Sequence, residues 1–197
     1  GYNGIQGFST TCDNSWKRVV NKYTSVINWN GTNPNSAYGT NDIDFGTDDK
    51  IYLVGSSSSV QGSTNGLLSR GSYQKTDWEI IGNNLSSNGD LEKPSSIFVT
   101  NDGEIYVTNY ETNNVRKNDG SSWSTIADSS NGIENPTDLW VTENKTIYIV
   151  YNGNGTSGGG VIKKGPDDSD WSNLDLTFSY AAADGAPLSI KVLEDGT

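Results

Sequence analysis

Residues 94–109 read PSSIFVTNDGEIYVTN, and this stretch decides the fold. Two runs rich in β-branched and aromatic residues flank a polar turn that contains Gly103, which is the pattern of a β-hairpin. Pro94 fixes φ at the start of the first run, where no ladder hydrogen bond is lost. The stretch therefore predicts two short antiparallel strands joined by a tight turn.

The same hairpin pattern recurs along the chain. Residues 40–55 read TNDIDFGTDDKIYLVG, and residues 136–151 read PTDLWVTENKTIYIVY. A fourth copy begins as PLSIKVLEDGT at residues 187–197 and breaks off before its second strand. The acidic residues at these turns are explained by turn geometry, which favours Asp, Asn and Gly.

Each complete hairpin is followed by a third short run and then by a fourth run that a tryptophan opens. These tryptophans are Trp78, Trp123 and Trp171, and Trp16 opens a similar run that no hairpin precedes. Four strands repeated every ~40–50 residues are typical of the blades of a β-propeller. We interpret the tryptophans as structural plugs between neighbouring blades, with contact to a ligand as the alternative.

The sequence thus predicts an all-β fold, a β-propeller of four-stranded antiparallel blades, in one domain over residues 1–197. Three complete blades are expected at residues 41–93, 94–135 and 136–186. A fourth blade is split between the ends of the chain, with its outer strands and a long loop in residues 1–40 and its inner strand in residues 187–197. We expect the two ends to pair within one molecule, with residues beyond Thr197 completing the blade. The alternatives are head-to-tail assembly with a neighbouring subunit and a fragment of a larger propeller.

The motif at residues 94–109, followed by NNVRK at residues 113–117, resembles NHL repeats. Residues 136–150 and 161–164 resemble them as well, so the resemblance covers about residues 41–197. It implies a propeller that binds proteins, glycans or RNA, and it transfers no catalytic residue. The regular tryptophan of the fourth run departs from the NHL pattern.

Composition excludes several classes of function. The net charge of −11 disfavours binding to nucleic acid, and no apolar run approaches the roughly 18 residues of a membrane span, so membrane insertion is not expected. The chain contains no histidine, which excludes Ser–His and Cys–His nucleophiles and histidine-ligated zinc. The single cysteine, Cys12, excludes an internal disulfide.

Two groups of residues are candidates for binding a ligand or partner. Tyr23, Trp29 and Tyr38 lie on the long connection before the first complete blade, where aromatic side chains stack on a sugar or a partner surface. An extra strand packed on the rim is the equally weighted alternative. Asp42 and Asp138 start inner strands, at positions that Ser96 and Ser189 occupy in the other repeats. These four residues are expected to surround the central channel, either as a ligand site or as a solvated polar ring.

Other candidates rest on weaker patterns. No cofactor or metal is expected, and calcium is the alternative. Its oxygen ligands would come from an acidic cluster that lacks EF-hand spacing, formed by Asp167, Asp168 and Asp170. Glycosylation sequons occur at Asn30, Asn84, Asn144 and Asn154. Chance also produces sequons in a chain so rich in Asn, Ser and Thr.

The sequence therefore favours an extracellular, secreted module that recognises a protein or glycan ligand, or serves as a scaffold, without catalysis. Its support is the absence of histidine, the acidic polar surface and the open-ended repeat. A glycan-binding lectin is the first alternative, because tryptophan, tyrosine and Asn/Asp-rich loops are abundant. A calcium-dependent hydrolase is the second, and only the carboxylates of the loops support it.

Overall fold

The structure is a computed structural model, and it describes residues 4–8, 16–21, 38–58, 64–71, 79–83, 89–153, 158–174 and 188–193. Within these residues the chain is almost entirely β-structure, with one turn of 3-10 helix at Ser129–Asn131. No helix in this part of the chain is long and apolar enough to cross a membrane.

Three antiparallel sheets of four strands form the body of the protein. The first sheet consists of β3 (Tyr38–Phe45), β4 (Ile51–Ser58), β5 (Thr64–Gly71) and β6 (Glu79–Asn83). The second consists of β7 (Pro94–Val99), β8 (Ile105–Asn109), β9 (Asn114–Asn118) and β10 (Trp123–Ala127). The third consists of β11 (Pro136–Val141), β12 (Ile147–Gly153), β13 (Gly158–Lys164) and β14 (Ser172–Leu174).

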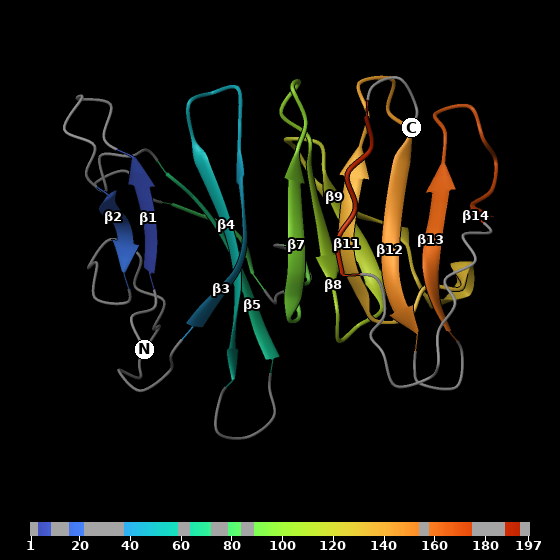
Figure 1. Ribbon diagram of the computed structural model, residues 1–197, viewed down its shortest axis with the longest axis horizontal. Helices are drawn as coiled ribbons and strands as arrows, with labels where there is room; N and C mark the ends of the chain where they lie inside the picture. The colour runs from blue at the N-terminus through green and yellow to red at the C-terminus, as the bar shows by residue number, and fades with distance from the viewer. Residues whose placement is uncertain are drawn as a thin grey trace.

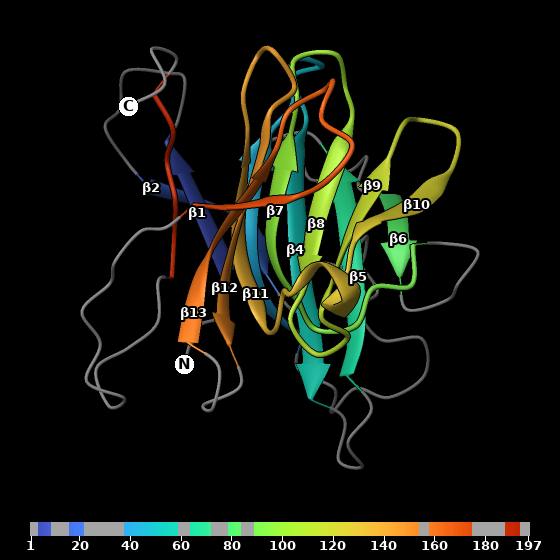
Figure 2. The same ribbon diagram turned by 90° about the vertical axis from the view of Figure 1, so that its right-hand side faces the viewer.

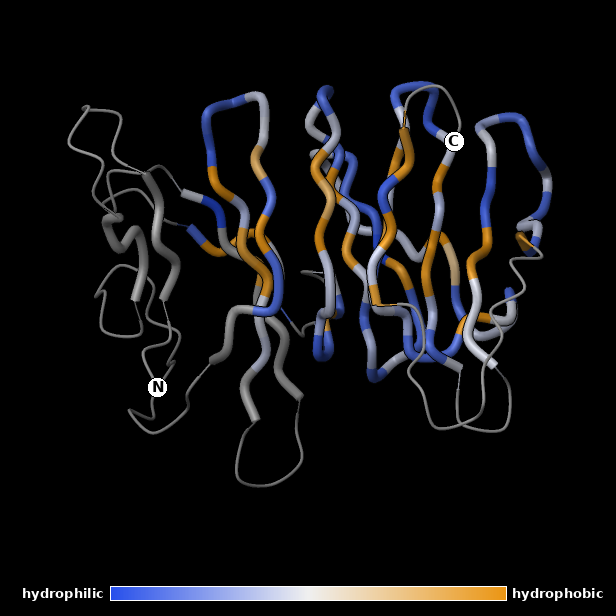
Figure 3. Tube along the Cα trace, viewed as in Figure 1, coloured by the Kyte–Doolittle hydropathy of each residue, from blue (hydrophilic) through white to orange (hydrophobic). Residues whose placement is uncertain are grey.

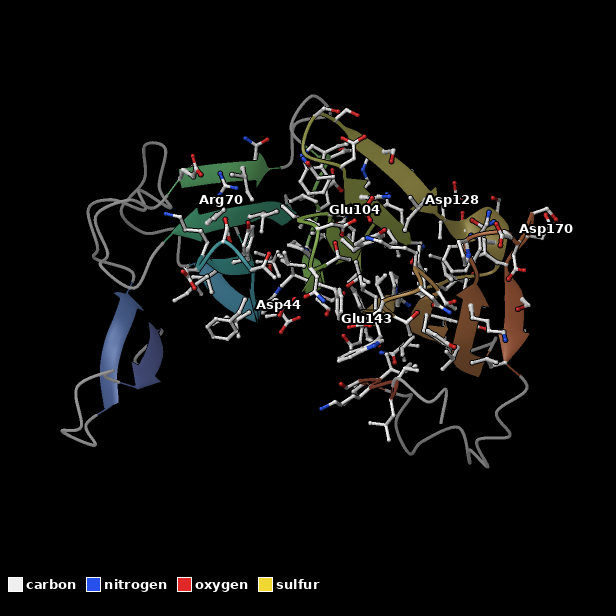
Figure 4. All side chains as sticks on the ribbon, turned by 90° about the horizontal axis from the view of Figure 1, so that it is seen from above. Asp44, Arg70, Glu104, Asp128, Glu143 and Asp170 are labelled. Carbon is white, nitrogen blue, oxygen red and sulfur yellow. The ribbon has the colours of Figure 1, made fainter. Side chains whose placement is uncertain are left out.

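Within each sheet the strands lie side by side in chain order, so each sheet is a meander. The first strands are neighbours in space, because β7 contacts both β3 and β11. Strands of all three sheets lie roughly along one axis and point alternately up and down it (Figure 1 and Figure 2). From above, the sheets fan out from the side where their first strands lie (Figure 4). This is the arrangement of propeller blades around a channel.

The backbone conformation of the hairpin turns explains why turn-forming residues recur at the same positions of the repeats. In the second sheet, the backbone N–H of Gly103 donates to the carbonyl of Thr100 at 2.9 Å, and Gly103 has a φ of 87°. In the third sheet Lys145 takes this place with a φ of 65°, and its N–H donates to the carbonyl of Thr142 at 2.9 Å. A left-handed φ favours glycine, so Lys145 is held there at an energetic cost.

Alternate residues of each sheet pack against different neighbours. Ile105 and Val107 of β8 belong to a core shared with the first sheet, whereas Tyr106 belongs to a core shared with the third sheet. Figure 3 shows that hydrophobic residues gather in the strands and hydrophilic residues in the turns. The core of the protein therefore lies between blades, because successive residues of a strand point to opposite faces of its sheet.

Two of the repeated tryptophans fill the space between blades, as the sequence predicts. Trp123 packs against the core between the first and second sheets. Trp171, just before β14, packs against the core between the second and third sheets, and its Nε1 donates to the carbonyl of Ile126 at 3.3 Å. Trp16 opens β2 (Trp16–Asn21), while Trp78 lies outside the described residues.

The two ends of the chain differ from the predicted split blade. β1 (Gly4–Phe8) pairs with β2 as expected, in a separate two-stranded sheet. Residues 188–193 were expected to form an inner strand, but they form no strand in the described part of the chain. The backbone N–H of Ile190 nevertheless donates to the side chain of Asp138, as that of Ile97 in β7 donates to Asp42. The β1–β2 sheet lies beyond β3, whereas residues 188–193 lie in front of β11 (Figure 1). Pairing of the two ends is thus not observed and stays a prediction.

Candidate functional site

Three residues that the sequence places at the start of the inner strands meet beside the channel. The hydroxyl oxygen of Ser96 in β7 lies 2.7 Å from Oδ2 of Asp42 in β3 and 2.7 Å from Oδ1 of Asp138 in β11. Ser96 is buried, with only 3% of its surface exposed. A hydroxyl carries one hydrogen, so Ser96 donates to one of the two carboxylates at a time. The ring of polar residues predicted from the repeats is therefore partly observed.

The same aspartates also accept hydrogen bonds from the backbone of the next repeat. The N–H of Ile97 donates to Oδ2 of Asp42 at 2.9 Å, and the N–H of Ile190 donates to Oδ2 of Asp138 at 2.8 Å. Each aspartate thus joins its own inner strand to the following repeat. Charge-assisted bonds of this kind are stronger than bonds between neutral groups, so these side chains hold blades in register.

Asp44, two residues after Asp42 in β3, also accepts a hydrogen bond from the backbone of the second blade. Its Oδ2 accepts a hydrogen bond from the backbone N–H of Val99 at 2.6 Å. Burial raises the pKa of Asp44 above its ordinary value of 3.8, although the bonds from the N–H groups of Val99 and Phe45 act in the opposite direction. Desolvation disfavours the charged form of a carboxyl group, which explains the direction of the shift.

A further link between blades was not anticipated from the sequence. The side-chain amide of Asn41 donates to the carbonyl of Pro94 at 2.5 Å, and the hydroxyl of Ser95 donates to the carbonyl of Pro136 at 2.6 Å. Asn41 and Ser95 occupy the same position in their repeats, immediately before Asp42 and Ser96. The periodic prolines therefore present carbonyl groups to the preceding blade, in addition to starting a strand.

A pocket of about 410 Å³ lies at the turn end of β7 and β11, and we call it the channel pocket. Its wall contains Phe98 and Trp140, whose rings meet edge to face with centroids 5.1 Å apart and an interplanar angle of 64°. Both rings are partly exposed, and Val192 closes another side of the pocket. A pocket of this size lies in the range of about 300–1,000 Å³ that is usual for small-molecule sites.

Polar groups surround the aromatic wall of the channel pocket. They come from the turns after β7 and β11, and they include the side chains of Asn101, Asp102, Glu143 and Lys145. The sequence did not single out Phe98 and Trp140 as binding residues. The available signal was that one repeat position changes from Asp44 to Phe98 and Trp140, which breaks an otherwise regular pattern.

The remaining predicted site residues are less informative. Tyr38 begins β3, and Tyr23, Trp29, Asn30, Asn84 and Asn154 lie outside the described residues. Asn144 is exposed in the turn after β11. Asp168 accepts a bond from the N–H of Gly165, and Asp170 accepts one from the hydroxyl of Ser169, while Asp167 is exposed. Within the described residues, no three acidic or cysteine side chains form a group able to hold a metal ion.

Comparison with known proteins supports the fold rather than a family. No protein-family model matches the sequence, and no curated protein matches it. Among solved structures, a luciferin-regenerating enzyme is similar with 13% identity and a TM-score of 0.57, over 82% of this chain and 50% of that chain. The chain has a β-propeller fold. At this identity the likeness carries nothing about function, and it does not single out NHL repeats.

Two other solved structures are more weakly similar. YCF48 bound to a peptide has 14% identity and a TM-score of 0.47, over 81% of this chain and 44% of that chain. A catalytically inactive virginiamycin B lyase from Staphylococcus aureus with quinupristin has 14% identity and a TM-score of 0.49, over 82% of this chain and 48% of that chain. The chain thus spans about half the length of these solved structures.

Proposed function

We propose that this chain is a secreted, non-catalytic recognition propeller that binds its ligand in the channel pocket. The proposal rests on a difference between two parts of the channel. In one part the polar side chains are already hydrogen-bonded, whereas the other part is an open pocket. Asp42, Asp44 and Asp138 are occupied by hydrogen bonds from neighbouring repeats. Phe98 and Trp140, by contrast, line an open pocket with polar groups around it. The first part holds the blades together, and the second part is available to a ligand.

A carbohydrate is the ligand that best fits the channel pocket. Sugar rings present flat C–H faces to aromatic side chains, and Phe98 and Trp140 supply such a wall. Sugar hydroxyls require both donors and acceptors, which Asn101, Glu143 and Lys145 supply at the rim. Apolar walls with a few placed polar groups are the usual composition of small-molecule sites. A protein ligand that inserts one apolar side chain is the second candidate.

The calcium-dependent hydrolase is the less favoured alternative. Such an enzyme would need carboxylate or amide oxygens that converge on a metal in the channel. Asp42 and Asp138 are the residues placed for this role, but both already accept hydrogen bonds from Ser96 or from backbone N–H groups. A metal would have to compete with these bonds, and breaking them would loosen the contacts between blades.

A binding screen with one variant and one matched control tests the proposal. We would titrate the protein with a panel of neutral oligosaccharides and peptides by isothermal calorimetry. Replacing Trp140→Ala should weaken binding of the best ligand by about tenfold or more, because stacking is lost. The control is Phe45→Ala, since Phe45 is 66% exposed on an inner strand and does not line the pocket. Equal affinity of wild type and Trp140→Ala would overturn the proposal, as would turnover of any panel sugar.

A further inference from the structure

A second pocket lies between the second and third blades, farther from the channel. It has a volume of about 470 Å³, and we call it the interblade pocket. Its apolar wall contains Ile126 of β10, Ile147 of β12 and Trp171. The bond from Nε1 of Trp171 to the carbonyl of Ile126 fixes the indole ring against this wall. The pocket therefore offers a rigid aromatic surface for a ligand.

The charged side of the interblade pocket is organised around Glu104. Lys117 of β9 lies 2.6 Å from Oε1 of Glu104, and Lys145 of the third blade lies 3.0 Å from Oε2. The hydroxyl of Tyr106 donates to the same Oε2 at 3.0 Å. Burial alone would raise the pKa of Glu104, but the bonds from the two lysines and the tyrosine outweigh it, so the pKa lies below its ordinary value of 4.5. Glu104 is ionised at neutral pH.

Lys145 links the two pockets, since it lines both of them. Besides Glu104, its ammonium group bonds to Oδ1 of Asp102 at 2.5 Å. Lys117 and Lys145 are thus matched by the carboxylates of Glu104 and Asp102. These four charges balance. The pocket also contains a third lysine.

That third lysine is Lys164 of β13. Its ammonium group donates to the carbonyl of Ser169 at 3.1 Å, and within the described residues it forms no ion pair. Asp167, Asp168 and Asp170 lie exposed on the loop that follows β13 and do not line the pocket. Among the described residues that line the pocket, three lysines thus stand beside one carboxylate, that of Glu104, in a protein whose net charge is −11.

We propose that the interblade pocket binds an acidic sugar that carries one carboxylate, of the uronic acid class. The carboxylate would pair with Lys164 and approach Lys117, which would balance the three lysines with three carboxylates. The sugar ring would stack on Trp171 and contact Ile126. A phosphate or sulfate group is a poorer match, because it lacks the ring that fills the apolar part. This site does not rest on ligand binding in the channel pocket.

The test compares two sugars of the same shape and different charge. We would titrate the wild-type protein with D-glucuronate and with D-glucose, and follow tryptophan fluorescence or calorimetric heat. Glucuronate should bind with saturation and glucose should bind at least about tenfold more weakly, a difference that added salt should reduce because salt screens the charge. Lys164→Gln should weaken glucuronate binding by about fivefold, as expected for loss of one partly exposed charge pair.

Two variants serve as controls. Lys93→Gln removes a lysine that pairs with Glu111 outside the pocket, and it should leave glucuronate binding unchanged. Trp140→Ala alters only the channel pocket and should also leave it unchanged. Equal binding of glucose and glucuronate would overturn the proposal, as would full affinity in Lys164→Gln. Loss of glucuronate binding in Trp140→Ala would place the acidic sugar in the channel pocket instead and would likewise overturn it.

Discussion

Lys145 of the third blade donates a hydrogen bond of 3.0 Å to Glu104 of the second blade. The bond crosses the boundary between two sheets, and it comes from a lysine whose φ of 65° would suit glycine better. Glu104 is largely buried, with 21% of its side chain exposed, and it also bonds to Lys117 and Tyr106. The second and third blades are therefore joined by a network of charges as well as by apolar packing.

Replacing Glu104→Gln should destabilise the protein by about 1–3 kcal/mol, because in a partly buried site it leaves Lys117 without its carboxylate and Lys145 with that of Asp102 alone. The measurement is the midpoint of urea unfolding. Glu111→Gln is the matched control, since Glu111 is 50% exposed and pairs with Lys93 at 3.2 Å on the surface. The control should change stability by at most about 0.5 kcal/mol. Equal effects of the two substitutions would contradict the importance of the network.

Acid should weaken this network in a defined direction. The pKa of Glu104 lies below its ordinary value of 4.5, and bonds from Lys145 and Thr100 lower the pKa of Asp102 from 3.8 to about 2. Carboxylates with lowered pKa values stabilise the folded state above the pKa of the unfolded chain, and this contribution is lost as pH falls through the folded pKa. The free energy of unfolding should therefore fall as pH decreases from 4.5 toward 2.

The variant Glu104→Gln isolates this effect from other titrating groups. Asp44 acts in the opposite sense, because burial raises its pKa and its folded form is favoured by protonation. Wild type and variant share Asp44, so the difference between their pH profiles reports Glu104. Urea unfolding between pH 2 and pH 7 should show a shallower acid loss in Glu104→Gln. Parallel profiles would show that Glu104 does not contribute in this way.

Trp123 should be among the most sensitive positions of the fold. It packs against the core between the first and second sheets, and a Cβ added at Gly89 would lie 3.0 Å from its ring. Trp123→Ala should cost about 3–4 kcal/mol, because it opens a cavity that a rigid sheet pair cannot close. Thermal unfolding checks this, with Phe45→Ala as the exposed control. A loss no larger than that of the control would refute the role of Trp123 as a plug between blades.

Ser96 should stabilise the channel by separating two carboxylates. Its hydroxyl lies 2.7 Å from both Asp42 and Asp138, so Ser96→Ala removes a hydrogen-bond donor from two partly buried acceptors. The expected loss is about 1–2 kcal/mol at pH 7. In Asp138→Asn the effect of Ser96→Ala should be smaller, because one of the two charges is gone, and a double-mutant cycle measures this coupling. Additive losses would indicate that the three groups do not interact.

The sequence contains most of the information about single blades, because strand pairing within a blade is local. Proline at the start of β7 and β11, the turn at Gly103 and the tryptophans at Trp123 and Trp171 all follow from the repeat. Contacts between blades are harder to predict, since they depend on how two sheets are placed in space. The bond from Lys145 to Glu104 joins two blades at positions that Asp49 and Lys50 occupy in the first blade. The charges at these positions change from one repeat to the next, so no periodic pattern indicates the bond.

The candidate site was predictable only in part, for a related reason. Asp42 and Asp138 stand out because they share a repeat position, and the structure brings both to Ser96. Phe98 and Trp140 stand out only as departures from the repeat, and their edge-to-face contact requires the inner strands of two blades to meet. Residues 188–193, which belong to the inner strand expected at residues 187–197, pair with no strand among the described residues, although the N–H of Ile190 bonds to Asp138 as that of Ile97 bonds to Asp42.

Asn144 provides a test of both secretion and the channel pocket. It is exposed in the turn after β11, between Glu143 and Lys145, which line the pocket. When the chain is secreted from a eukaryotic host, a glycan is expected on Asn144, and Asn144→Gln should remove one glycan mass from the intact protein. A glycan there would crowd the pocket, so the variant should bind the channel ligand more tightly than the glycosylated wild type. An unchanged mass would show that the sequon is not used, and unchanged affinity despite glycan loss would argue that the ligand does not approach the pocket past this turn.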